Sequence, residues 1–137
     1  MGKMEIHRSD LQVIHYEAEK YLMQVVVSPN TKYIGDESFQ EAQRKILALS
    51  EEYLPTRMLI NLQDLLYTIP PEMQEWTAKE IIPTLIELCV KRLAYIIPNE
   101  FYAQLSVEQL VSEIPALNFV TAFFMEEKVA IEWLCEK

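Results

Sequence analysis

The chain has 137 residues, of which 50% are apolar and 24% are charged, and its formal net charge is -9. This length and balance predict one soluble globular domain, residues 1–137, that can bury a core without a disulfide or a structural metal. The acidic surface argues against binding to nucleic acid or to an anionic membrane, because 12 Lys and Arg against 21 Asp and Glu form no visible basic face.

The N-terminal part of the chain predicts an antiparallel hairpin. Its two strands, residues 11–16 and 21–27, are rich in β-branched and aromatic side chains, and the polar segment 17–20 separates them. We also consider a short edge piece at residues 4–7, ahead of the hairpin. Pro29 stops the second strand, because proline cannot donate a hydrogen bond to a neighbouring strand.

After the hairpin, helical and strand patterns alternate to the end of the chain. The expected elements are helices at residues 36–53, with Asp36 as the N-cap, and at residues 69–89, 101–114 and 126–136, and strands at residues 57–62, 93–97 and 117–123. Strands that alternate with helices pair in parallel through right-handed crossovers. The expected fold class is therefore α/β: a single domain with a mixed, mostly parallel five-stranded sheet, an N-terminal antiparallel hairpin and four main helices.

The helix at residues 69–89 predicts which side chains stay outside the core. At 100° per residue, most apolar side chains of residues 78–89 share one face, which must meet the sheet. Met73 and Trp76 fall on the opposite, charged side, so we expect them outside the main core, in a surface that contacts a partner. The alternative is that they pack on a neighbouring helix or on the preceding loop. Pro83 predicts a kink that rotates the two halves of the helix relative to each other.

The counts of glycine and cysteine narrow the chemistry. The chain contains two glycines, Gly2 and Gly35, whereas loops that cradle phosphate groups need several glycines so that backbone amides can approach the ligand. This excludes nucleotide binding through such a loop, and we expect no cofactor. Cys89 and Cys135 are isolated in apolar helical contexts, which predicts small buried thiols and neither a disulfide nor a metal site.

No pattern of catalytic residues stands out. His7 and His15 lie in the N-terminal hairpin, away from the strand end that carries Asp64, so no Ser/His/Asp or Cys/His arrangement can be proposed. We therefore expect no enzyme activity.

The first residues are not followed by the apolar run of a secretory signal, and no stretch approaches the roughly 20 apolar residues of a membrane span. We expect cytoplasmic localisation and no stable membrane anchoring.

The order of the expected elements resembles the STAS domain, the fold of bacterial anti-sigma-factor antagonists. Four segments are similar to its SpoIIAA-like branch, namely YTIPPEMQEW at residues 67–76, VKRLAY at 90–95, FYAQLSVEQ at 101–109 and AIEWL at 130–134. Members of this branch are short stand-alone bacterial proteins that are structurally akin to CRAL-TRIO lipid-transfer domains. The resemblance implies a non-catalytic regulatory or ligand-binding module.

The resemblance also implies a switch at the start of the helix that follows the strand at residues 57–62. In anti-sigma-factor antagonists a phosphorylated Ser lies there, and here Thr68 is the only aliphatic hydroxyl of the segment from Asp64 to Thr68. A phosphate at this point would be stabilised by the helix N-terminus, although Thr68 could equally cap that helix. Asp64 lies where loops at the carboxyl ends of parallel strands converge on ligands, or else satisfies a turn backbone.

Two functions follow from these patterns. The first is a regulatory or protein-interaction module that binds an unknown protein partner or a second copy of itself, with Met73, Trp76, Asp64 and Thr68 as the contact surface. The second is a carrier or sensor of a lipophilic small molecule, held in an apolar pocket between the second and third helices and the sheet. The expected lining of that pocket is Tyr95, Phe101, Tyr102 and Leu105. Cavity volume separates the two, since a ligand pocket needs roughly several hundred cubic ångströms and a core has only small voids.

Overall fold

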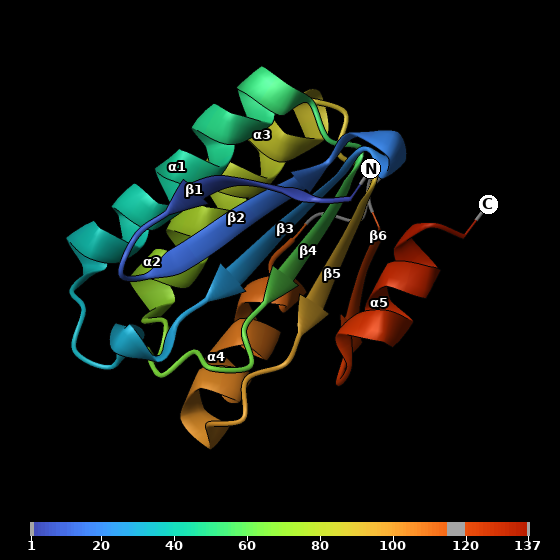
Figure 1. Cartoon of the computed structure of the whole chain (residues 1–137). Helices are drawn as coiled ribbons and strands as arrows, with labels where there is room; N and C mark the ends of the chain where they lie inside the picture. The colour runs from blue at the N-terminus through green and yellow to red at the C-terminus, as the bar shows by residue number, and fades with distance from the viewer. Residues whose placement is uncertain (1, 115–119, 137) are drawn as a thin grey trace.

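The computed structural model describes residues 2–114 and 120–136, and its strands form a single mixed sheet (Figure 1). The strands are β1 (Met4–Arg8), β2 (Gln12–Glu17), β3 (Leu22–Val27), β4 (Arg57–Asn61), β5 (Arg92–Ile96) and β6 (Val120–Phe124). They lie side by side in chain order. The pairs β1–β2 and β2–β3 are antiparallel, whereas β3–β4, β4–β5 and β5–β6 are parallel.

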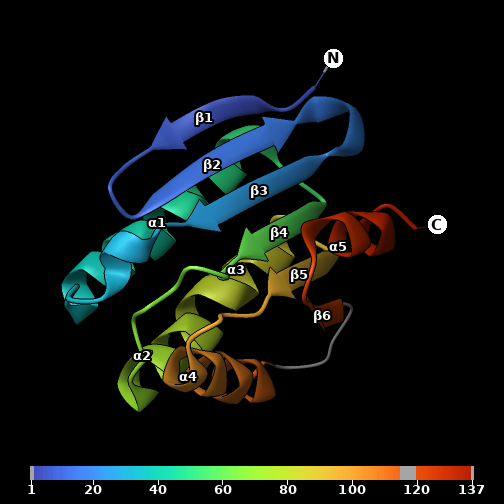
Figure 2. The same cartoon turned by 60° about the horizontal axis from the view of Figure 1, so that its bottom comes forward.

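The helices cover the two faces of this sheet unequally (Figure 2). They are α1 (Asp36–Tyr53), α2 (Pro71–Trp76), α3 (Ile82–Glu87), α4 (Phe101–Ser112) and α5 (Glu127–Leu134), with short 3-10 turns η1 (Ala18–Lys20) and η2 (Pro29–Thr31) and a π-helical turn η3 (Thr77–Ile81). Because the parallel strands follow one another in chain order, right-handed crossovers place α1, α2, α3 and α4 on the same face. α5 packs on the other face.

The expected α/β class with a mixed sheet is confirmed, but the expected number of strands is wrong. Residues Met4–Arg8 form a full edge strand, so the described sheet has six strands and not five. The pairing of β1 with β2 shifts by one residue between Glu5 and His7, and this bulge interrupts the alternation that would have marked the strand in the sequence. Of the strand expected at residues 117–123, residues 117–119 lie outside the described part of the chain.

Two apolar cores lie on the two faces of the sheet. The larger one joins one face to α1, α2, α3 and α4, and contains the buried side chains of Ile14, Val25, Met58 and Leu93. The smaller one lies under α5 and joins Leu22, Leu59, Ala94 and Ile96 to Ala130 and Leu134. Two arginines hold the C-terminal end of α5 in place. Arg57 Nε donates to the Leu134 carbonyl at 2.7 Å, and Arg92 Nη1 donates to the Trp133 carbonyl at 2.5 Å. Cations are favourable at this end of a helix.

Residues 71–87 form one helical run with the π-helical turn in its middle. Pro83 lies two residues after that turn, has no amide hydrogen and cannot tolerate the carbonyl of residue 79 at its usual position. The wider π-helical turn relieves this conflict, and so the irregularity expected at Pro83 takes this form. A wheel of 100° per residue therefore misplaces the side chains before the turn relative to those after it.

Cys89, which follows the C-cap residue Leu88 of α3, has a left-handed backbone conformation that favours glycine. Cys89 has a φ of 76° and is exposed, so the expectation that its thiol is buried was wrong. A side chain with a Cβ atom costs about 1 kcal/mol or more in this region, and glycine is common there at helix ends. We expect Cys89→Gly to raise the free energy of unfolding in urea by about 1 kcal/mol. Cys89→Ala removes the thiol and keeps Cβ, so an equal gain in that variant would contradict the backbone explanation.

Candidate functional site

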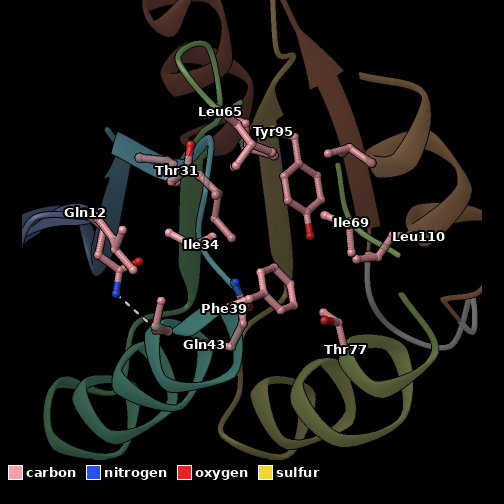
Figure 3. Close-up of a pocket in the computed structure, with 16 residues that line it drawn as sticks. Gln12, Thr31, Ile34, Phe39, Gln43, Leu65, Ile69, Thr77, Tyr95 and Leu110 are labelled. Carbon is pink, nitrogen blue, oxygen red and sulfur yellow. Dashed lines mark hydrogen bonds between the residues drawn. The ribbon is translucent and has the colours of Figure 1, made fainter. Parts of the chain in front are cut away.

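A pocket lies between the sheet and the helices of its more covered face (Figure 3). Its lining side chains come from segments that are far apart in the sequence: Ile60 and Tyr95 from β4 and β5, Phe39 and Gln43 from α1, Leu65 and Ile69 from the loop between β4 and α2, Thr77 from η3, and Val107 and Leu110 from α4. Most of the lining is apolar. The pocket is therefore a product of the whole layer of helices and not of one motif.

The size of the pocket limits what it can hold. Its volume is about 60 Å³, counted as the space open to the centre of a water molecule. On the same measure one water molecule needs roughly 10–15 Å³. The pocket is therefore larger than the voids of an ordinary core, but it falls short of the several hundred cubic ångströms expected of a ligand pocket from the sequence. It has room for a few water molecules or one small molecule, and none for a long lipid chain.

A shallower and more polar groove adjoins the pocket. The groove lies between the β1–β2 turn and α1, and His7, Ser9, Asp10, Ser38, Glu41 and Lys45 line it. Leu11, Gln12 and Ala42 line both hollows. The Gln12 side chain is buried, and its Nε2 donates to the Ala42 carbonyl at 3.1 Å. Gln12 thus lies between the groove and the pocket.

A side-chain hydrogen bond helps to fasten the loop that forms part of the pocket wall. The Tyr67 hydroxyl donates to Asp36 Oδ1 at 2.7 Å, which ties the loop before α2 to the first turn of α1. Burial, together with the Asp36 carboxylate, raises the pKa of Tyr67 well above its usual value. The phenol therefore stays protonated and keeps donating across the physiological range of pH.

The polar groups of the pocket differ in how well they are satisfied. The Thr31 hydroxyl donates to the Ser28 carbonyl at 3.1 Å and accepts from the Leu66 amide at 2.9 Å. Thr77 is 3% exposed, and its Oγ1 has no hydrogen-bond partner among the described residues. Tyr95 is buried, and burial raises the pKa of its hydroxyl with no hydrogen bond contributing. Among the described residues, these two hydroxyl groups in an apolar wall thus have unused hydrogen-bonding capacity.

Of the four residues expected to line a pocket, Tyr95 does so and the other three do not. Phe101, Tyr102 and Leu105 are exposed on the outer face of α4. The Glu100 carboxylate caps this helix by accepting from the Tyr102 and Ala103 amides at 3.1 and 2.7 Å, which fixes where it begins. The buried stripe that follows is Ala103, Ser106, Val107 and Leu110. This i, i+3, i+4, i+7 spacing is the sequence signal that would have found Val107 and Leu110.

The four residues expected to form a contact surface do not share one environment, because Met73 and Trp76 pack in or against the core whereas Asp64 and Thr68 are exposed. Met73 is buried in the larger core, and Trp76 is half-buried against it, so the prediction that both stay outside the core is corrected. The Trp76 ring meets Phe39 of α1 edge-on at 6.4 Å, and the Arg44 guanidinium lies 5.5 Å from its centroid. Packing on a neighbouring helix, the alternative considered for these two residues, describes what is found.

Asp64 and Thr68 lie on the surface. Both are exposed, and they belong to the loop that leads from β4 to α2. The N-cap residue of α2 is Pro70, and no side chain caps this helix. Thr68 therefore does not act as its cap, and its hydroxyl is accessible. The phosphorylation of Thr68 stays a prediction.

Within residues 2–114 and 120–136, no group of three or more His, Cys, Asp and Glu side chains could hold a metal ion. In the same part of the chain, no helix is long and apolar enough to cross a membrane.

Comparisons with known proteins leave the family open. No family model, curated protein or solved structure matches this chain. The similarity to the SpoIIAA-like branch therefore stays a prediction, and function must be argued from the site itself.

Proposed function

We propose that the protein is a non-catalytic binding module that carries or senses a small, largely apolar molecule. The observation that supports this proposal best is the pocket of about 60 Å³, whose wall is apolar apart from a few hydrogen-bonding groups. Sites for small molecules usually combine these two properties. The ligand is smaller than the lipids that the sequence suggested, because the volume has no room for a long chain.

The wall of the pocket suggests how a ligand could be reported to the surface. α1, η3 and α4 all contribute to it, and η3 is a π-helical turn. Such turns are often found at functional sites, since they are less regular than the α-helix around them. A ligand that contacts Thr77 would favour one arrangement of the turn, and the exposed side of the same helical run would carry the change outward.

The test combines a native mass spectrum with a titration. Protein purified without detergent should show a mass excess from a retained small molecule. Toluene, added to ligand-free protein, should shift the methyl NMR signals of Val107 and Leu110 in a saturable way, because both residues line the pocket. The methyl signals of Leu134, in the core under α5, serve as the internal control. Absence of both the mass excess and the saturable shift would contradict the proposal.

A second candidate function is a protein interaction through the C-terminal third of the chain. Large exposed apolar side chains are frequent in this part of the sequence, namely Phe101, Tyr102, Leu105, Val120, Phe123, Met125 and Val129. β6 is an edge strand of the described sheet, and no residue of Val120–Phe124 carries a charge, whereas the opposite edge, β1, contains Glu5 and Arg8. Uncharged edges favour pairing with another chain. The same native mass spectrum tests this function, since a dimer would support it and a monomer would count against self-association.

A further inference from the structure

Thr77 differs from the other buried or helical hydroxyl groups on this face of the sheet. Within helices, Ser and Thr hydroxyls normally donate to a carbonyl of the preceding turn. Ser50 does so to Ile46 at 2.7 Å, Ser106 to Ala103 at 2.8 Å and Thr84 to Glu80 at 3.0 Å. Thr77 Oγ1 makes no such bond and has no other partner among the described residues, although the residue is 3% exposed.

Tyr95 supplies a second hydroxyl to the same space. Its ring stacks on Phe123 with centroids 5.9 Å apart, which holds the side chain in place on β5. Its hydroxyl points into the pocket toward Thr77 (Figure 3). Burial raises its pKa, so the proton stays on the oxygen and can be donated. β5 and the π-helical turn thus present to one cavity two donors that have no partner among the described residues.

We propose that the Thr77 and Tyr95 hydroxyl groups bind the oxygen of an uncharged carbonyl group, so that the ligand is a small apolar ketone, aldehyde or ester. This inference rests on the proposed function and adds the class of ligand. A carbonyl oxygen has two lone pairs and can accept from both donors at once. A carboxylate does not fit, because no lining residue in the described part of the chain is charged and a buried charge without a partner is costly.

The test uses two probes of nearly identical shape. Cyclohexanone has a carbonyl oxygen where methylenecyclohexane has a CH₂ group, so only the first can accept hydrogen bonds. The measured quantity is the ratio of their dissociation constants, taken from NMR titrations of the Val107 and Leu110 methyl signals. This ratio cancels the contribution of the apolar ring, which both probes share.

Four variants connect this ratio to the two hydroxyl groups. Thr77→Val and Tyr95→Phe each remove one oxygen and keep the shape, so each should lower the preference for the ketone several-fold, and the double variant should lower it by about tenfold. Thr77→Ser keeps the hydroxyl and should keep most of the preference. Ligand-free Thr77→Val should melt at the same temperature as the parent protein or higher, because an unpartnered buried hydroxyl is lost.

The outcomes separate this inference from the proposed function. If both probes bind but Thr77→Val and Tyr95→Phe leave the ratio unchanged, the carbonyl inference fails and the pocket remains a binding site. If the double variant binds both probes and the preference has disappeared, the inference is supported. If neither probe nor toluene binds, the cavity holds only water and both proposals fail. A lower melting temperature of Thr77→Val with an unchanged ratio would assign the hydroxyl a structural role instead.

Discussion

Replacing Val107 with Phe should abolish the binding of small apolar molecules, with the affinity for toluene falling by about 100-fold or more. Val107 is 2% exposed, lies on the inner stripe of α4 and lines the pocket. The larger ring would occupy much of the 60 Å³ that a ligand needs. Overpacking a tight core costs about 1–3 kcal/mol, and here part of the added volume enters space that is already open. The fold should therefore survive.

The matched control is Leu105→Phe, two residues earlier on the same helix. Leu105 is 41% exposed and lies outside the pocket lining, so the same ring at this position should leave toluene binding unchanged. Binding is measured by the titration described above, and stability by urea unfolding. Toluene binding that survives in Val107→Phe would show that the binding site lies elsewhere. A loss in both variants would point to a general effect on α4.

Much of the fold could be predicted because its signals are local. The helix α1 was expected after an N-cap at Asp36 and before Pro55, and it is found at Asp36–Tyr53 with Gly35 as its N-cap, since its apolar spacing is regular and Pro55 follows it. β4 and β5 were expected from short unbroken apolar runs, which are typical of strands covered on both faces. β1 was considered as a short edge piece at residues 4–7 and left out of the strand count, because Glu5, His7 and Arg8 are unremarkable in a loop and suit an exposed edge equally well.

The candidate site could be predicted only in part, because it depends on contacts between distant segments. Tyr95 was correctly expected in the pocket wall, because it lies near the end of a buried strand. Thr77 was missed, because its sequence neighbours give no sign that its hydroxyl lacks a partner. That property arises only when η3 packs beside β5 and α1. Phe101 and Tyr102 were preferred for their aromatic character, although the helical spacing of Val107 and Leu110 was the better guide to the buried face.

Replacing Trp76 with Ala should lower the free energy of unfolding by about 2 kcal/mol. The sequence alone had suggested that this change would leave folding nearly intact. In the structure the indole contacts the ring of Phe39 and lies beneath the Arg44 guanidinium, so the substitution removes an aromatic contact and a cation–π interaction at once. Because Trp76 is half-buried, the loss should be smaller than the 3–5 kcal/mol, roughly, of a fully buried aromatic side chain.

The control for this prediction is Tyr33→Ala, which removes an aromatic side chain that is 88% exposed and should change stability by less than about 0.5 kcal/mol. Urea unfolding followed by circular dichroism measures both variants. Phe39 also lines the pocket, so the loss of its Trp76 contact should loosen that wall and weaken toluene binding, whereas Tyr33→Ala should not. If Trp76→Ala matched the control in stability and lost only association with another protein, the side chain would belong to a contact surface, and the ring contact with Phe39 would contribute little to the fold.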